Sequence, residues 1–395
     1  MPWSPPSLMS QRLEFIYAVV QRHVAMRTAC REFGISEKTG HKWLQRFLRG
    51  GPTALADRSH APHTPAHQLS QAVIDAICSL RDAEPSWGSR KLREVLIHEH
   101  PETTWPAAST ITTLLKRQGL IVPRRRSAQE RAAWAAGHLT IPSAPNDVWT
   151  ADFKGHFRLQ SGPYCYPLTV VDLCSRTVLG LHALPSTASE AAQSHFVHLF
   201  ELYGLPSVIR TDNGVPFGAP NALGGLSPLA VWWIRLGIRP ERIHPGAPQE
   251  NGAHERMHRT LKAETTRPAA TTFAAQQQRF DRWQRTFNER RPHEALGMTP
   301  PATRYAPATR RYPRRLPILA YASSADVRRV DCNGTIRWAS TRVFLSRVFT
   351  GEYVAVVESG EGEWAIYFGP LQLGYYRREA AAFVEALAWP PPLSA

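Results

Sequence analysis

The hydrophobic periodicity of this chain changes type along its length, and this most constrains its fold. Apolar residues recur at helical spacing up to residue 126, strand and helix patterns alternate over 147–262, and only strand patterns follow residue 323. Residues 51–69 and 127–145 are aperiodic and contain or end in proline, which is typical of linkers. Since 395 residues suffice for two to four domains, we predict a multidomain chain.

The predicted boundaries follow these changes of pattern. They give a helix-turn-helix domain at 1–50, a linker at 51–69, a second helical domain of winged type at 70–126, a linker at 127–145, an α/β core with a trailing helix at 146–310, and a small all-β barrel at 320–380.

Composition narrows the class of partner. The net charge of +15 and the pI near 10 favour a polyanion, with nucleic acid ahead of an anionic membrane surface. No apolar run has the length of a membrane span, and the N-terminal segment does not resemble a secretory signal. The five cysteines are scattered without a CxxC pair, which indicates free thiols in a reducing compartment. We therefore expect a cytoplasmic, nucleoid-associated protein that does not use a membrane.

The first helical region resembles a helix-turn-helix in its pattern. VAMRTACREF is followed by Gly34, which permits a tight turn, and by Ser36, a good N-cap for the helix EKTGHKWLQRF. The apolar side of that helix holds Trp43, Leu44 and Phe47. The side chains predicted to contact DNA are Lys38, Thr39 and Lys42. A plain helical hairpin explains the same pattern, and both interpretations remain open.

The second helical region contains three short amphipathic patterns, SQAVIDAICSLRDA, GSRKLREVLIHEH and ASTITTLLKRQGL. It ends in a run of basic residues, for which we predict phosphate contacts: Arg124, Arg125 and Arg126.

Of two aspartates in the α/β block, Asp152 lies within a predicted strand and Asp212 at the C-terminal end of another. Asp152 lies in VWTADFKGHF, on the face of Thr150, and Asp212 follows SVIRT just before an Asn-Gly turn. Carboxylates at strand ends face the crevice where α/β proteins bind ligands. Taken singly, each also fits a structural role, as a turn cap or as a partner of Arg210.

Three glutamates lie in HPGAPQENGAHERMHRTLKAE. A helix that starts near Asn251 places Glu255, Arg259 and Lys262 on one face. Met257 and Leu261 then point toward the sheet. Glu264 lies about 180° from Glu255, and Glu250 precedes the helix. An i, i+4 pair on a solvated helix remains the alternative explanation for Glu255.

The C-terminal region has only strand signals. VRRVDCNGTIRWAS predicts a hairpin with a turn at Asn333-Gly334, and three more strands follow in EYVAVVES, EWAIYFG and LQLGYYRR. Some five short strands joined by tight turns predict a small closed barrel. The preceding helix, FAAQQQRFDRWQRTFNER, places Phe280, Trp283 and Phe287 on one core-facing side.

Residues 146–300 resemble the catalytic core of retroviral integrases and of the DDE transposases of bacterial insertion sequences. The resemblance is carried by WTADFKG, VVDLCSR, IRTDNGVPF and HPGAPQENGAHERMHRTLKAE, with FNERRPHEALGMTPPATRY following. It implies a ribonuclease H-like core flanked by DNA-binding helical units and a barrel of the Src-homology-3 type. The chain lacks the His/Cys zinc module of retroviral integrases, and is therefore more similar to the bacterial transposases.

The resemblance implies that Asp152, Asp212 and Glu255 are the catalytic acids and bind two Mg²⁺ or Mn²⁺ ions. Such ions take carboxylate oxygens as ligands and assist in-line displacement at phosphorus. Asp152 is expected to bridge the ions, with Asp212 on one and Glu255 on the other, while Arg259 and Lys262 hold phosphates. Transposon-end DNA and target DNA are the implied partners, and synapsis of two ends implies a homo-oligomer.

Other acidic and histidine side chains, and two other functions, are alternatives to this interpretation. Asp172 is expected to have a structural role beside Arg176, and His156, His244, His254 and His258 are expected at the surface or against phosphate. The interval from Asp212 to Glu255 is longer than usual for the family, and we place the extra length in APNALGGLSPLAVWW. A domesticated transposase acting as a DNA-binding regulator and a structure-selective nuclease are the alternative functions.

Overall fold

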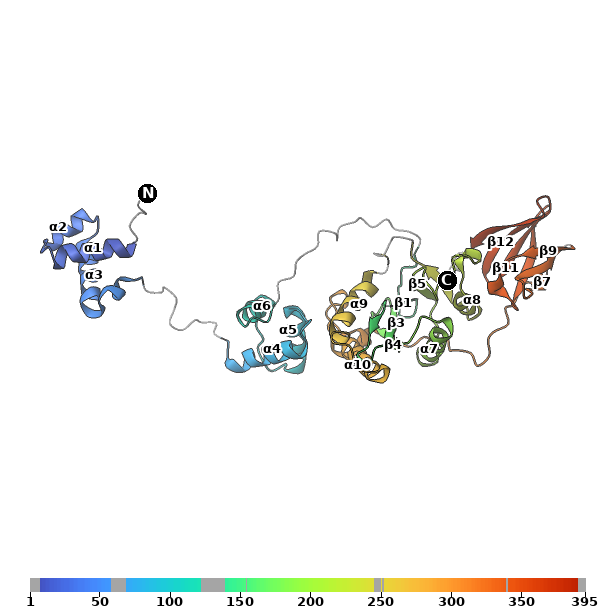
Figure 1. Ribbon diagram of the computed structural model, residues 1–395, viewed down its shortest axis with the longest axis horizontal. Coiled ribbons are helices and arrows are strands. Elements are labelled where there is room, and N and C mark those ends of the chain that lie inside the picture. The colour runs from blue at the N-terminus through green and yellow to red at the C-terminus, as the bar shows by residue number, and fades with distance from the viewer. Residues whose placement is uncertain are drawn as a thin grey trace. The chain divides into compact units, whose positions relative to one another are not determined.

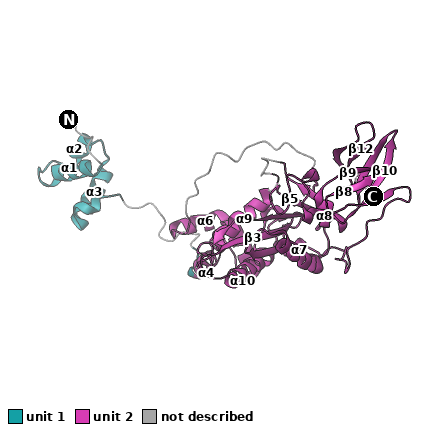
Figure 2. Cartoon of the chain, turned by 45° about the vertical axis from the view of Figure 1, so that its right-hand side comes forward, with its two compact units in different colours: residues 1–71 teal, residues 72–395 magenta. Residues whose placement is uncertain are grey.

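The computed structural model describes residues 8–57, 69–121, 139–153, 155–244, 250, 252–338 and 340–389. The chain forms two compact units, residues 1–71 and 72–395 (Figure 2). Arg124, Arg125 and Arg126 lie outside the described residues. All five cysteines are described, and each is a free thiol. Among the described helices, none combines the length and apolarity needed to cross a bilayer.

The first unit contains the predicted helix-turn-helix. Its elements are α1 (Leu8–Val20), α2 (Met26–Glu32), α3 (Glu37–Gly50) and the 3₁₀ helix Pro52–Leu55. Ser36 caps α3 by accepting a hydrogen bond from the Thr39 amide at 3.2 Å, as predicted. Leu55 is fully buried beside Trp43, so this unit extends past residue 50 into the segment that we predicted as a linker.

A second helical bundle has its own core. It consists of α4 (Gln71–Ala83), α5 (Ser89–Glu99) and α6 (Ala108–Arg117). Trp87, Leu92 and Ile111 are fully buried at its centre, as three amphipathic helices require. Residues 69–121 contain these helices and no strand, whereas residues 122–126 of the predicted winged-type domain lie outside the described residues.

The α/β block is built on a six-stranded sheet (Figure 1). Its strands are β1 (Val148–Phe153), β2 (Phe157–Arg158), β3 (Tyr164–Asp172), β4 (Val178–Leu184), β5 (Val208–Thr211) and β6 (Arg239–Arg242). β3 pairs antiparallel with β1, β2 and β4, whereas β1, β5 and β6 are parallel neighbours. The order of strands and helices agrees with the predicted α/β core, with β2 as an additional short strand.

Helices pack on both faces of this sheet. They are α7 (Ser189–Tyr203) and α8 (Pro228–Arg235) on one face, and α9 (Gly252–Thr265) and α10 (Phe273–Arg285) on the other. Trp149 and Ala151 join the core under α7 and α8, while Thr150 faces α9, which confirms the predicted alternation along β1. The aromatic side chains of α10 and the turn after it pack under the second face, also as predicted.

The C-terminal region is all-β, as predicted. Its strands are β7 (Asp326–Arg329), β8 (Thr335–Trp338), β9 (Thr341–Phe344), β10 (Tyr353–Gly360), β11 (Glu363–Phe368), β12 (Leu371–Arg377) and β13 (Ala382–Ala388). The main sheet has the order β13-β12-β11-β10-β7, and the described pairings do not join its two edges into a closed barrel.

The predicted hairpin between β7 and β8 was wrong. β7 pairs with β10, and β8 pairs with β9 instead. The turn at Asn333-Gly334 does form, because Asp331 accepts hydrogen bonds from the Asn333 and Thr335 amides. These bonds close a compact loop that redirects the chain without a ladder between the flanking strands.

Helix α8 joins the sheet to the C-terminal domain. Leu229 and Trp233 pack into the α/β core, whereas Val231 and Ile234 pack into the core of the all-β domain. The segment before α8 also meets that domain, since the Gly224 amide donates to Glu385 Oε1 at 2.8 Å. The interval between Asp212 and Glu255 thus supplies contacts to the C-terminal domain.

Candidate active site

Strand register brings the two aspartates to the same edge of the sheet. β1 and β5 run parallel with Thr150 opposite Arg210. Asp152 and Asp212 each follow by two residues, so both stand at the carboxyl ends of neighbouring strands. Both side chains are half-buried rather than sequestered. The register therefore brings Asp152 and Asp212 to the same edge of the sheet, although the cluster of possible metal ligands among the described residues joins Asp152 to His254 and His258.

A buried polar network attaches α9 to β1 and β3. His254 Nδ1 lies 2.7 Å from Thr150 Oγ1, and its Nε2 lies 2.6 Å from Thr169 Oγ1. His258 Nε2 lies 2.6 Å from the same Thr169 hydroxyl, and His258 Nδ1 is 3.4 Å from Asp152 Oδ2. This network fixes the start of α9 over the strand that carries Asp152.

The expectation that His254 and His258 lie at the surface was wrong. Both are buried, with 1% of each residue exposed. With Met257 and Leu261 they occupy positions i, i+3, i+4 and i+7, the spacing of a buried helical stripe. The sequence contains that spacing, but only the tertiary structure identifies Thr150 and Thr169 as the polar partners of the two histidines.

Asp152, His254 and His258 together form a cluster able to hold a metal ion, with one ligand atom from each within 4.8 Å of the others. Their ring nitrogens already make hydrogen bonds to threonine hydroxyls or approach the carboxylate. An ion bound by both imidazoles would have to displace those bonds. The geometry therefore favours a hydrogen-bonded support for Asp152.

The three glutamates around α9 have different surroundings. Glu255 is exposed on the first turn, as are Arg259 and Lys262 farther along the helix. Glu250 Oε2 accepts a hydrogen bond from the His244 amide at 2.8 Å. Glu264 accepts a hydrogen bond from Trp283 Nε1 at 2.5 Å, as suits a structural side chain.

Asp212 also stabilises the turn that follows it. Its Oδ1 accepts a hydrogen bond from the Gly214 amide at 3.1 Å. Arg210 is not its partner, because Arg210 Nε forms a buried ion pair with Glu241 Oε2 at 2.7 Å. The Asn-Gly turn and an accessible carboxylate therefore coexist at this position.

Asp172 has the structural role that we expected, with different partners. It is fully buried and accepts hydrogen bonds from the Asn146 amide and from the amide and hydroxyl of Ser175. Burial raises the pKa of its carboxyl, against the effect of these hydrogen bonds. It closes the turn from β3 to β4 on which Arg176 stands.

The side chains predicted to contact DNA in the first unit lie along α3. Lys38 and Lys42 are exposed, and the Lys42 ammonium lies 5.2 Å from the centroid of the Trp43 ring. Thr39 contributes to the cap of the helix through its hydroxyl, 2.9 Å from Ser36 Oγ.

Family comparisons agree with this architecture. Two models described as an integrase core domain match residues 142–248 and 236–301. A helix-turn-helix domain model matches residues 11–63, and a homeodomain-like domain model matches residues 39–115. The matches therefore cover the α/β block and both helical regions.

Similar proteins come from mobile elements. The chain is 30% identical over 249 residues to an uncharacterized 39.2 kDa protein of insertion element IS476 from Xanthomonas euvesicatoria, covering 62% of this chain and 66% of that protein. It is 26% identical over 248 residues to an uncharacterized 31.7 kDa protein of insertion element IS407 from Burkholderia multivorans, covering 62% of this chain and 83% of that protein.

Among solved structures, the HTLV-2 integrase catalytic core domain in complex with magnesium is 18% identical, with a TM-score of 0.31 over 42% of this chain and 99% of that one. The assignment rests on the family models and on the insertion-element relatives. The chain therefore contains integrase core and helix-turn-helix domain sequences and is similar to proteins of bacterial insertion elements.

Proposed function

We propose that this protein cleaves phosphodiester bonds at transposon ends and joins the resulting ends to target DNA, with Asp152, Asp212 and Glu255 as its catalytic acids. The observation that carries the proposal is the parallel pairing of β1 with β5, which aligns the two aspartates. The histidine network attaches the helix of Glu255 to the same strand. We call these three carboxylates the acidic edge.

The acidic edge suits a hard divalent cation. Carboxylate oxygens are the ligands that Mg²⁺ and Mn²⁺ prefer, and all three side chains are at least partly exposed to solvent. Two such ions, when bound, activate the attacking oxygen and stabilise the leaving one. Asp152, Asp212 and Glu255 would hold these ions.

Residues around the acidic edge would position the DNA and the strand that carries Asp152. Arg259 and Lys262 stand on the exposed side of α9, where their charges can hold the DNA backbone beside the acidic edge. Thr169 links both histidines to β3 and donates a hydrogen bond to the Asp152 carbonyl oxygen at 2.9 Å. This arrangement limits movement of the strand that carries the central carboxylate.

The remaining domains are assigned to DNA recognition and assembly. Lys38, Thr39 and Lys42 of α3 would read transposon-end DNA, and the second helical bundle would contribute further backbone contacts. We propose that the C-terminal β domain has a fold of the Src-homology-3 type and serves in assembly. Because integration joins two DNA ends, the acting species would be a homo-oligomer on DNA.

The test is a cleavage and strand-transfer assay on the full chain with duplexes taken from the DNA that flanks its gene. We expect products with Mg²⁺ or Mn²⁺, none with EDTA, and none from Asp152→Asn, Asp212→Asn or Glu255→Gln, each of which should still bind the duplex. If the unaltered chain binds the duplex without cleaving it, the result would favour the alternative function, a DNA-binding regulator. Cleavage by any one variant would remove that residue from the acidic edge.

A further inference from the structure

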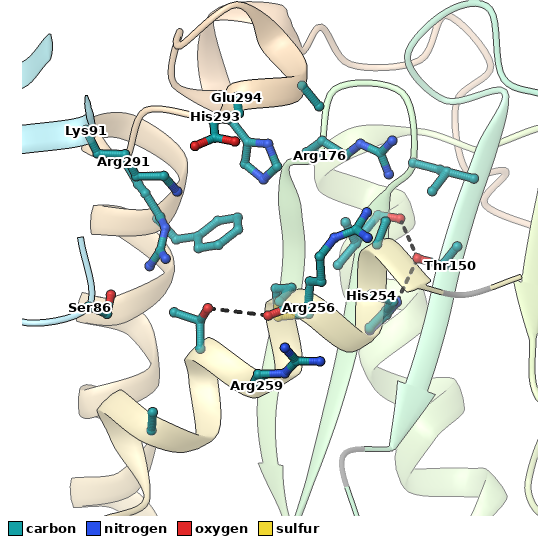
Figure 3. Close-up of a pocket in the computed structure, with 18 residues that line it drawn as sticks. Ser86, Lys91, Thr150, Arg176, His254, Arg256, Arg259, Arg291, His293 and Glu294 are labelled. Carbon is teal, nitrogen blue, oxygen red and sulfur yellow. Dashed lines mark hydrogen bonds between the residues drawn. The ribbon is translucent and has the colours of Figure 1, made fainter. Parts of the chain in front are cut away.

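A cavity of about 660 Å³ lies between α9, the turn after β3 and the segment after α10. Its floor includes Thr150 and His254 of the network described above, so it adjoins the helix of the acidic edge. Its charged lining is mostly cationic: Lys91, Arg176, Arg256, Arg259 and Arg291, with Glu294 as the carboxylate. Figure 3 shows these side chains around one space.

The cations of this lining differ in their ion pairs. Arg291 Nη1 forms an ion pair with Glu264 Oε1 at 3.4 Å. Among the described residues, Lys91, Arg176 and Arg256 form no ion pair. Three positive charges from α5, the β3–β4 turn and α9 thus meet at one cavity, in which Glu294 is the carboxylate of the lining.

Two buried donors or acceptors in the same lining lack partners. Among the described residues, Arg176 Nη1 and His293 Nδ1 are buried side-chain atoms without a hydrogen bond. A buried polar atom left unpaired costs free energy, so such atoms mark a place where a ligand group can bind. Arg176 also has a left-handed backbone, with φ of 65°, which disfavours a non-glycine residue.

The pKa of His293 also reflects the positive charges around this cavity. Burial, followed by the charges of Lys91, Arg176 and Arg291, lowers the pKa of His293 to about 4. The imidazole is therefore neutral at pH 7. With its neighbours charged, the cavity presents cations and an imidazole to an incoming anion.

We propose that Lys91, Arg176, Arg256, Arg291 and His293 form a binding site for a backbone phosphate of DNA, which we call the basic pocket. Guanidinium groups pair with phosphate oxygens through two parallel hydrogen bonds, and the cavity is large enough to admit the sugar as well. DNA is the favoured source of this phosphate because Arg259, which lines the pocket, follows Glu255 of the acidic edge by one turn of α9. The proposal rests on the proposed DNA-processing function.

The test measures binding without catalysis. The full chain is titrated into a labelled duplex in EDTA across a range of salt, and fluorescence anisotropy is recorded for Arg176→Gln, Arg256→Gln and the unaltered chain. Arg282→Gln, an exposed change on α10, is the control for the loss of one charge. We expect each pocket variant to bind about tenfold more weakly at low salt, with a salt slope smaller by about 1.

Further measurements identify the source of the phosphate and exclude misfolding. Arg176→Lys, which keeps the charge but loses the planar fork, should recover part of the affinity, and thermal melts should show each variant folded. Pocket variants that match Arg282→Gln would overturn the proposal. Loss of thermal stabilisation by inorganic phosphate together with unchanged duplex binding would overturn DNA as the source.

The two proposals fail separately in these experiments. Absence of cleavage by the unaltered chain would count against catalysis at the acidic edge, while the anisotropy measurement in EDTA contains no catalytic step. Weaker duplex binding by pocket variants would then still support a phosphate site.

Discussion

The acidic edge and the basic pocket share helix α9 but are assembled differently. Two members of the acidic edge stand on paired strands, so backbone register sets their separation. The basic pocket draws Lys91 from α5, Arg176 from the β3–β4 turn and Arg291 from the segment after α10. Its geometry depends on how separate elements pack. Sequence motifs can therefore predict a site whose residues are aligned by strand register, but they cannot predict a site that forms only when separate elements pack together.

The largest expected effect is a loss of cleavage, and it distinguishes Glu255 of the acidic edge from its neighbour Arg256 of the basic pocket. Glu255→Gln should slow cleavage at least about 10³-fold, because several kcal/mol of transition-state stabilisation depend on the metal ligands. Duplex affinity should change little, in contrast to the expected result for Arg256→Gln. Single-turnover cleavage and anisotropy measure the two quantities. Glu289→Gln, an exposed change after α10, removes the same charge, and an equal loss of cleavage there would contradict the role of Glu255.

The second prediction concerns the network between the sites. Thr169→Val removes a buried hydroxyl that contacts the Nε2 atoms of both histidines and the Asp152 carbonyl oxygen. We expect a loss of about 1–3 kcal/mol in the free energy of unfolding, measured by urea denaturation of the full chain. Thr169→Ser keeps the hydroxyl and should retain most of the stability. Equal losses in both variants would mean that the methyl group, rather than the hydrogen bonds, matters.

The third prediction uses pH to examine the basic pocket. Burial, with the charge of Arg291, lowers the pKa of Lys91 to about 8, while Glu294 and Glu264 oppose the shift. A bound phosphate favours the charged ammonium, so duplex affinity should be highest below pH 8 and fall severalfold as pH rises above it. Lys91→Met should abolish this dependence. Lys116→Met, an exposed change on α6, should leave it intact; a pH profile unaltered by Lys91→Met would exclude Lys91 from the pocket.

The smallest effect is expected at the ion pairs beside the pocket. Arg290 contacts Glu99 at 2.7 Å and Glu84 at 4.0 Å, which connects the second helical bundle to the segment after α10. The Arg290 and Glu99 side chains are about two-fifths exposed, so Glu99→Gln should cost less than about 1 kcal/mol. Denaturation measures this cost, and duplex affinity should stay within about threefold. A larger fall in affinity would show that this pair holds Lys91 in place.

The prediction from sequence succeeded where local patterns carry the information. The alternation along β1 assigned Thr150 and Trp149 to opposite faces, and the cap at Ser36 fixed the start of α3. The hairpin at Asn333-Gly334 failed because the turn signal is local, while the choice of partner strand is not. The burial of His254 was missed because a histidine on an apolar stripe needs partners that only distant strands supply.

The sequence by itself determined the order of domains, the helical and strand segments, and the motifs that place Asp152, Asp212 and Glu255 within an integrase-like core. Periodicity and turn residues act over a few neighbours, so one chain read in order reveals them. The tertiary structure alone decided the network that supports Asp152 and the convergence of Lys91, Arg176 and Arg291 on one cavity. Those arrangements join residues far apart in the chain, and packing of the elements brings them together.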